Sequence, residues 1–426
     1  MRQQILHTPE GVRDIYGIEC RRKLMLEEKL QEILHLYGDL HSFPTRRSSD
    51  LTPMFEFFDV FGKEIGTISS KELYKFFDRD GNTLVLRPDI TPSIARVAAT
   101  FLDSKGLPVR LCYNGNTFIN HSSYRGKLKE STQMGAELLG IDSLEADAEM
   151  IALAADCLKA AGLNEFQIYI GNVDFFESLL EDADLEEEKE ARLRELIANR
   201  NYFGVEELLD NCGVKEETKA AFRVLEELTG GIEIMERAKK IVSCEKALRA
   251  VERLSETYEI LVSYGVEKYI TFDLSMSGTY GYYTGIIFRG YTYGTGDAIV
   301  KGGRYDHLVE KFGKEFPSIG FAIVIDELMG AISRQKLEIP YHQKNTLILY
   351  EESERSRAIA LAKEFRLAKK PTELVKKSDD RFLDEYVSYA RQNFCGGMFY
   401  LKREDEILMT NLLTDEKKTV GWEEII

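Results

Sequence analysis

The sequence lacks the features that mark several classes of protein. No apolar run approaches the roughly 20 residues that a membrane-spanning helix requires, and the polar start MRQQ does not suit a secretory signal. The six cysteines form no Cys-x-x-Cys pair and no cluster with histidine, so we expect neither a zinc site nor a disulfide framework. The sequence therefore predicts a cytoplasmic protein with reduced, structural thiols, no metal and no membrane contact.

An excess of basic residues is also missing. The chain has 56 Lys and Arg against 72 Asp and Glu, which gives a formal net charge of -16. Proteins that bind nucleic acid neutralise phosphates with Lys and Arg, and no basic stretch of useful length occurs apart from Arg46-Arg47. We therefore expect no nucleic-acid partner, and solubility is a sufficient reason for the acidity.

Length and composition indicate several domains. The 426 residues exceed what one hydrophobic core normally organises, and a hydrophobic content of 44% is enough to bury two or three cores. Residues 173–265 are strongly charged, and their apolar residues recur at helical spacing, which predicts a helical insertion. The insertion divides a core of residues 1–172 and 266–340, and a small α/β domain over residues 341–426 follows the core.

Local patterns predict the elements of the core. Strand-like runs separated by Gly-rich turns are typical of an antiparallel sheet, and amphipathic or Ala-rich runs predict helices beside it. The fold class is therefore α+β. The main elements expected are helices over residues 21–37, 93–101, 143–161 and 304–312, and strands over residues 83–86, 109–113, 131–139, 166–170, 270–274 and 285–288.

Five short motifs occur in order along the chain. They are Thr8–Asp14 (TPEGVRD), Leu86–Pro92 (LRPDITP), Tyr280–Gly285 (YGYYTG), Gly302–Asp306 (GGRYD) and Gly320–Ala322 (GFA). Together they resemble the class II aminoacyl-tRNA synthetase core in its histidyl-tRNA synthetase version, and the resemblance covers nearly the whole chain. It implies an antiparallel sheet flanked by helices and a dimer formed through the motif 1 region that begins at Pro53.

The resemblance fails at the three positions where the family holds ATP with arginine. Ile119 replaces the arginine of motif 2, Glu327 replaces that of motif 3, and Gly278 replaces the arginine four residues before the paired tyrosines. Arginine grips phosphate through a planar fork of donors, which neither Ile119 nor Gly278 provides. Glu327 would repel a triphosphate. We therefore expect no catalytic residues and no cofactor.

The positions that recognise histidine in the family are retained. By resemblance, Asp89 and Thr91 recognise the α-amino group of histidine. Gln133 and Glu137, which face the same side of one strand, line the amino-acid pocket. Tyr282 and Tyr283 cover the imidazole. These six residues are Asp89, Thr91, Gln133, Glu137, Tyr282 and Tyr283. Each alone also fits an ordinary turn, strand or sheet role, but jointly they favour a histidine site.

Other polar residues in the motifs do not point to chemistry. Arg304 and Asp306 are expected to order the turn into a following helix rather than to touch a ligand. His121 and His307 have no neighbouring residues for triad chemistry and make no metal-spaced pair, so surface or core roles are expected for them.

The whole pattern is similar to the regulatory subunits of ATP phosphoribosyltransferase, which are non-catalytic relatives of histidyl-tRNA synthetase. This similarity implies a hetero-oligomer with the short-form catalytic subunit, a role in the first step of L-histidine biosynthesis, and L-histidine as the effector of feedback inhibition. Two alternatives remain. An active histidyl-tRNA synthetase would need the missing arginines and a tRNA-binding surface, whereas an orphan histidine-binding module fits the residues equally well.

The segment Ser42–Leu51 fits neither a strand pattern nor the family, and it resembles translated sequencing-adapter sequence. We expect this segment to be a foreign insertion. Replacing it with a short linker of the family type should then preserve or raise the Tm, because changes in loop length cost little closure entropy. Calorimetry of the two chains measures this, and a Tm lowered by several degrees would show that the segment is structural.

Overall fold

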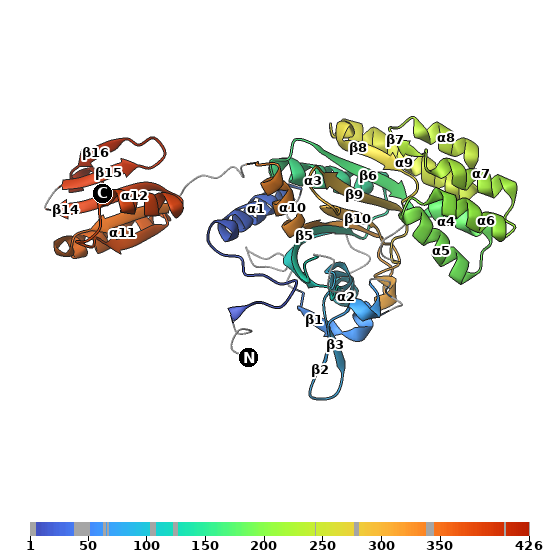
Figure 1. Cartoon of the computed structure of the whole chain (residues 1–426), viewed down its shortest axis with the longest axis horizontal. Coiled ribbons are helices and arrows are strands. Elements are labelled where there is room, and N and C mark those ends of the chain that lie inside the picture. The colour runs from blue at the N-terminus through green and yellow to red at the C-terminus, as the bar shows by residue number, and fades with distance from the viewer. Residues whose placement is uncertain are drawn as a thin grey trace. The chain divides into compact units, whose positions relative to one another are not determined.

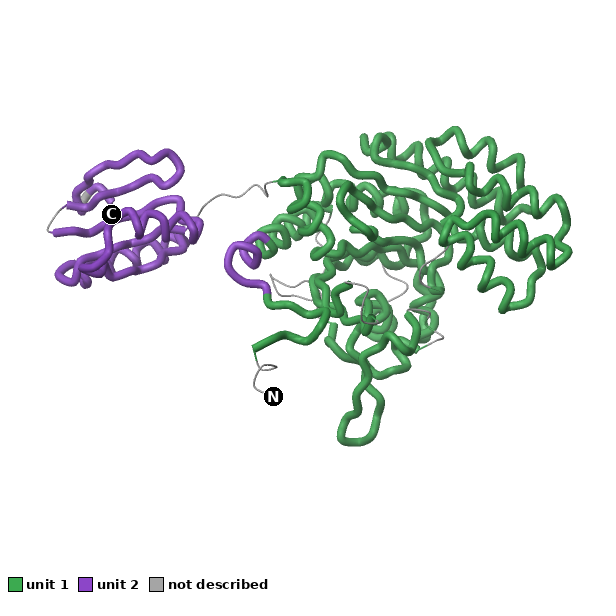
Figure 2. Tube along the Cα trace, in the orientation of Figure 1, with its two compact units in different colours: residues 1–14, 23–339 green, residues 15–22, 340–426 purple. Residues whose placement is uncertain are grey.

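The computed structural model describes residues 6–37, 52–62, 65, 68–102, 108–121, 127–242, 244–276, 281–337, 345–403 and 406–425. Segment 42–51 and Gly278 lie outside these residues. The chain divides into two compact units, shown in Figure 2. Unit 1 comprises Met1–Asp14 and Lys23–Ile339, and unit 2 comprises Ile15–Arg22 and Pro340–Ile426.

Unit 1 is built on an eight-stranded sheet with the strand order β4-β5-β11-β10-β9-β6-β8-β7 (Figure 1). Neighbouring strands are antiparallel except β6 and β8, which confirms the predicted fold class. The strands are β4 Val109–Phe118, β5 Glu130–Leu139, β6 Phe166–Asn172, β7 Thr229–Gly230, β8 Ile270–Asp273, β9 Ile286–Thr292, β10 Val300–Arg304 and β11 Ser318–Val324.

The two faces of this sheet meet different layers, because successive side chains of a strand point to opposite faces. On β5, Met134, Ala136 and Leu138 join a core that α1 Gly17–Leu36, α3 Leu144–Ala160 and α10 Ile325–Arg334 complete. The opposite face packs against α2 Thr91–Phe101. That second face carries Gln133 and Glu137, so the sheet itself directs both towards the α2 side.

Between residues 173 and 263 the chain forms helices α4 to α9, with the short strand β7 between α7 and α8, and these helices gather beside β7 and β8 (Figure 1). Buried residues such as Phe175, Phe222 and Leu254 belong to the same core as the sheet. We call this part the α4–α9 segment. It comprises α4 Val173–Ala183, α5 Glu187–Ala198, α6 Tyr202–Asn211, α7 Glu216–Leu225, α8 Ile234–Ile241 and α9 Glu245–Ser263.

A second, three-stranded sheet with the order β1-β3-β2 follows α1. Its strands are β1 Phe55–Phe57, β2 Lys75–Phe77 and β3 Thr83–Leu86, and β3 has the predicted bounds. The buried guanidinium of Arg87 donates to the carbonyl oxygens of Thr52 at 2.7 Å and Asn116 at 2.8 Å. These bonds attach the start of the small sheet to β4 of the large one.

Unit 2 has a five-stranded sheet with the order β13-β12-β14-β15-β16. Leu347 and Leu349 of β12 face α12, whereas Ile348 faces α11, so one helix covers each side. The sequence patterns did not distinguish β13, β15 and β16. The elements are β12 Asn345–Tyr350, α11 Arg355–Leu367, β13 Thr372–Lys376, α12 Leu383–Gln392, β14 Cys395–Arg403, β15 Glu406–Asn411 and β16 Lys417–Val420.

The predicted helix over residues 304–312 is wrong. Arg304 is the last residue of β10, where it pairs with Ile319 of β11, and only Glu310–Phe312 forms a short 3₁₀ turn. Arg304 stays extended because the strand pairing continues to this residue and its side chain is held by Asp147 and Asp306. Tertiary pairing thus overrides the local pattern.

Within the described ranges, no helix has both the length and the apolarity to cross a membrane. No group of three His, Cys, Asp or Glu residues in those ranges could hold a metal ion. All six cysteines are free thiols, and Cys112, Cys157 and Cys395 are buried.

Candidate functional site

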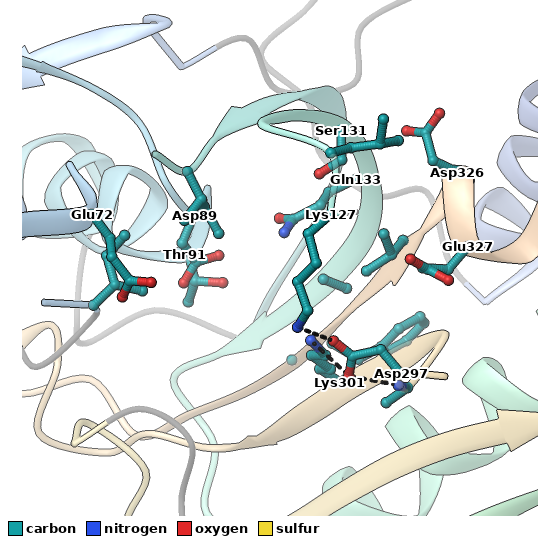
Figure 3. A pocket seen from close by; sticks show the side chains of 18 of the residues that line it. Glu72, Asp89, Thr91, Lys127, Ser131, Gln133, Asp297, Lys301, Asp326 and Glu327 are labelled. Atoms are coloured by element: carbon teal, nitrogen blue, oxygen red, sulfur yellow. Dashed lines mark hydrogen bonds and ion pairs between the residues drawn. The ribbon is translucent and has the colours of Figure 1, made fainter. Parts of the chain in front are cut away.

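A cavity of about 430 Å³ opens on the α2 side of the large sheet (Figure 3). Its walls come from the start of α2, from β5 and β11, from the loop before β9 and from the turn after β10. The fold therefore brings together segments that lie far apart in the sequence. All six residues predicted for histidine recognition line this cavity: Asp89, Thr91, Gln133, Glu137, Tyr282 and Tyr283.

The carboxyl group of Glu137 lines this cavity. It is 1% exposed, and its two oxygens accept hydrogen bonds from Thr91 Oγ1 at 2.8 Å and from the Tyr305 hydroxyl at 2.5 Å. Burial raises the pKa of Glu137 to about 8, although both hydroxyl bonds lower it. At neutral pH this carboxyl group is therefore mostly protonated.

Asp89 is a second buried acid in the same cavity. Its Oδ2 accepts a hydrogen bond from the Tyr282 hydroxyl at 2.8 Å, and its Oδ1 accepts one from the Ile90 amide at 2.8 Å. Burial raises the pKa of Asp89, and the charge of Asp89 in turn raises the pKa of Glu137. A cation placed between these two acids would lower both pKa values, so the cavity favours a positively charged ligand.

Tyrosine rings form another wall. The rings of Tyr282 and Tyr283 are 5.0 Å apart, and Tyr305 lies edge-on to Tyr282 at 6.0 Å. Close approach by glycine makes room for them, because a Cβ on Gly303 would lie 2.8 Å from the Tyr283 ring. This wall offers aromatic faces with hydroxyl groups at their ends, which suits a flat polar ring.

Two residues next to Glu137 were not predicted as part of the site. Tyr305 was visible only as part of the GGRYD motif, and no periodicity separates a cavity-lining tyrosine there from a core one. Gly320 lies beside Glu137 across the β5–β11 pairing, and a Cβ at this position would lie 1.5 Å from Glu137 Oε2. Its need for glycine could have been inferred only from the strand register.

Gln133 supplies an acceptor without a partner among the described residues. Its side chain is 8% exposed, faces the cavity and has no hydrogen bond at Oε1 (Figure 3). Leaving a buried acceptor unsatisfied is costly, so a donor from a ligand would be stabilised here.

The other end of the cavity is acidic. Ile119 and Glu327, at two of the predicted lost ATP positions, both line it, and Glu327 stands in the first turn of α10. Figure 3 shows Asp326 and Glu327 across the cavity from Asp89. A carboxylate in a first helical turn is stabilised by the helix dipole, which gives Glu327 a structural role as well.

Two lysines reach this acidic end, and both contact the same aspartate. Lys127 Nζ lies 3.3 Å from Asp297 Oδ2, and Lys301 Nζ lies 3.4 Å from Asp297 Oδ1 (Figure 3). Their charge is partly neutralised within the protein, so they are poor substitutes for free phosphate-binding arginines.

Of the other polar motif residues and histidines, His121 lines the cavity, whereas His307 and Arg304 do not. His121 lines the cavity, with Nδ1 3.8 Å from Glu72 Oε1, which the sequence did not indicate. His307 is exposed beside Glu310. Arg304 is not among the described residues that line the cavity, and it donates to Asp306 Oδ1 at 3.0 Å; only the short 3₁₀ turn Glu310–Phe312 follows this pair, where a helix was expected.

The fold and the retained residues define a protein of the histidyl-tRNA synthetase class. A family model described as histidyl-tRNA synthetase matches residues 11–328. The histidyl-tRNA synthetase of a Nostoc species shares the fold, with a TM-score of 0.78 over 98% of each chain at 20% identity.

Sequence relatives narrow the class. The chain is 38% identical to the ATP phosphoribosyltransferase regulatory subunit of Acetivibrio thermocellus over 99% of its own length and 98% of the relative. It is 36% identical to the protein of that name from Ruminiclostridium cellulolyticum over 96% of each. A crystal structure of an ATP phosphoribosyltransferase regulatory subunit/histidyl-tRNA synthetase from Bacillus halodurans has a TM-score of 0.79 at 32% identity, covering 94% of this chain and 99% of that one. The chain belongs to the family of ATP phosphoribosyltransferase regulatory subunits, which confirms the prediction from its motifs.

The raised pKa of Glu137 predicts a pH-dependent stability. Its folded pKa of about 8 exceeds the ordinary value of 4.5, so its contribution to stability is complete below pH 4.5 and is lost as the pH rises through about 8. Glu137→Gln removes the titrating group and should flatten the decline of the unfolding free energy across this window. Urea unfolding at several pH values measures the slope.

Glu188→Gln is the matched control, because Glu188 is an exposed glutamate in α5. It should keep the slope of the unmodified protein. Equal slopes for the unmodified protein and Glu137→Gln would contradict the assignment of the titration to Glu137.

Proposed function

We propose that this protein is a non-catalytic regulatory subunit of ATP phosphoribosyltransferase that binds L-histidine in the cavity on the α2 side of the sheet. It acts with the short-form catalytic subunit in the first step of histidine biosynthesis and mediates feedback inhibition by histidine. Its family supports the regulatory role. The observation that carries the ligand assignment is a cavity whose amino-acid end is intact while its phosphate end is acidic.

The chemistry of the intact end matches histidine. An α-ammonium group supplies the positive charge that Asp89 and Glu137 favour, and a ligand N–H can satisfy Gln133 Oε1. The tyrosine wall provides flat faces and hydroxyl groups for the imidazole. Other amino acids offer the same ammonium group, so selectivity for histidine comes from the tyrosine wall.

The acidic end argues against adenylate formation. Among the described residues that line this end, Lys127 and Lys301 stand against the carboxyl groups of Asp297, Asp326 and Glu327. Stabilising the transition state of phosphoryl chemistry requires fixed positive charge, which usually contributes most to catalysis of this kind. The active-synthetase alternative therefore has little support from this cavity.

An exposed apolar face of the small sheet supports self-association. Phe55 and Phe57 of β1 are 50% and 57% exposed, and Phe76 of β2 packs edge-on against Phe55. Between the two phenylalanines of β1, Glu56 points inward and binds Arg96. Contiguous exposed apolar surface of this kind marks interaction sites. We infer that a second copy of the chain covers it, since the resemblance assigns the motif 1 region to the dimer.

Gln133→Ala tests the ligand assignment. It removes one hydrogen bond to a charged ligand and should weaken L-histidine binding by about 1.5 to 3 kcal/mol. Isothermal titration calorimetry measures the Kd. A histidine titration of phosphoribosyl-ATP formation by the mixed subunits should show weaker inhibition while assembly is retained, because an effector acts through differential affinity.

Gln167→Ala provides a control, since Gln167 lies on β6 away from this cavity. An unchanged inhibition curve for Gln133→Ala would place the effector site elsewhere. Failure of the unmodified chain to stimulate the catalytic subunit would favour an orphan histidine-binding module. Histidine-dependent exchange of pyrophosphate into ATP would favour a synthetase.

Phe57→Glu tests the dimer. A charge on the apolar face should convert the protein to a monomer, because burying an unpaired carboxylate in an interface is costly, and histidine affinity should be unchanged. Light scattering after size-exclusion chromatography measures the mass. Phe203→Glu alters a phenylalanine of α6 that is 81% exposed and should remain dimeric. A monomeric unmodified protein would contradict this proposal.

A further inference from the structure

A fully buried carboxylate joins two arginines behind the histidine cavity. Asp147 lies in the first turn of α3 and is 0% exposed. Its Oδ1 accepts hydrogen bonds from Arg304 Nε at 2.9 Å and Nη2 at 2.6 Å. Its Oδ2 accepts one from Arg253 Nε at 2.8 Å, and Arg253 lies on α9. Arg304, the last residue of β10, is thus bonded to the α4–α9 segment through Asp147, and Asp142 lies between the same two arginines, with its Oδ1 2.7 Å from Arg253 Nη2 and 3.6 Å from Arg304 Nη1.

Arg304 also fixes the two chain segments that carry the cavity tyrosines. The next residue along the chain, Tyr305, donates to Glu137 in the cavity. Arg304 Nη1 donates to Asp306 Oδ1 at 3.0 Å, and the backbone oxygen of Arg304 accepts from the Thr284 amide at 2.9 Å. Thr284 directly follows the paired tyrosines, so both tyrosine segments are held at one point.

Thr284 and Asp306 strengthen this junction from the other side. Thr284 Oγ1 donates to Asp306 Oδ2 at 3.1 Å, and the Asp306 amide donates to Thr284 Oγ1 at 3.0 Å. The Ser318 amide donates to Asp306 Oδ1 at 3.0 Å, which brings in the first residue of β11. The polar groups at the junction are bonded to one another, and such networks hold a single geometry.

The start of the α4–α9 segment makes a second connection to the same place. The amide of Val173, the first residue of α4, donates to the carbonyl oxygen of Gly285 at 2.8 Å. Gly285 follows Thr284. The first and last helices of the α4–α9 segment are therefore bonded, directly or through Asp147, to residues adjacent to the cavity tyrosines.

We propose that Arg253 is a positioning residue that couples occupancy of the histidine cavity to the α4–α9 segment through Asp147 and Arg304. A ligand that restrains the cavity tyrosines restrains Arg304, and the buried ion pairs pass this restraint to α9. The coupling is reciprocal, so a constraint on the α4–α9 segment changes histidine affinity by the same free energy. The inference rests on the proposed function, because histidine is the ligand concerned.

Hydrogen exchange of α9 amides, with and without saturating L-histidine, tests the coupling. In the unmodified protein, histidine should slow exchange in α9. Arg253→Met keeps the aliphatic stem but removes the guanidinium, so it should abolish this histidine-dependent change and weaken histidine binding by between about twofold and thirtyfold. Arg253→Lys retains the charge and should restore part of the response.

Arg249→Met is the matched control, because Arg249 lies one turn earlier on α9 with its side chain 69% exposed. It should leave both the exchange response and the histidine affinity unchanged. Asp147 is not used, since its removal would take from the buried Arg304 guanidinium the carboxylate that accepts two of its hydrogen bonds and could unfold the protein. A merely structural Arg253 would lower the Tm in the variant without changing the histidine-dependent exchange.

Calorimetric titration of the unmodified chain with L-histidine separates the two proposals. Absence of binding would overturn both the proposed function and the coupling. Binding without slower α9 exchange, or with the same change in Arg253→Met, would overturn the coupling and leave the proposed function standing.

Discussion

The buried carboxyl group of Glu137 is the interaction on which the rest of the site depends. It gathers a hydroxyl from the start of α2 and another from the residue after β10, and it lies against Gly320 of β11. Removing this carboxyl group from water costs free energy, and the two hydrogen bonds offset part of that cost. Burial also raises its pKa, so the group avoids the larger cost of burying a charge. Three distant segments are thereby held around one buried acid.

Charge divides the cavity into two ends. The end beside Asp89 and Glu137 has acids whose pKa values are raised by burial, and a cationic ligand relieves the cost of ionising them. At the other end, Asp297 already pairs with both lysines, and Glu327 lines the cavity from the first turn of α10. A triphosphate would meet carboxylates there instead of a guanidinium fork. The proposed binding of histidine without ATP rests on this difference between the two ends.

Satisfied and unsatisfied polar groups are also separated in space. Behind the cavity, both oxygens of Asp147 are bonded to arginines, so that region is fixed. Facing the cavity, the side-chain oxygen of Gln133 has no partner among the described residues. A ligand that binds at Gln133 can therefore act on the bonded residues around Asp147. For this reason we expect a change at the cavity to reach α9.

The sequence by itself determined the family and the α+β class, and it predicted six residues that the structure brings together in one cavity. Motif residues such as Asp89 and Tyr283 are recognisable because their identity and order survive without knowledge of the fold. Regular periodicity was enough to predict α3 and β3, since local patterns dominate in long amphipathic or short apolar runs.

Only the tertiary structure decided how those residues act. Arg304 ends a strand instead of beginning a helix because its pairing with β11 and its bond to Asp147 outweigh local preference. The Tyr305 hydroxyl donates to Glu137, and Lys127 forms an ion pair with Asp297. Both contacts join segments that lie far apart in the chain. Burial, pairing and pKa depend on neighbours that the linear sequence does not specify, so these properties follow from the fold alone.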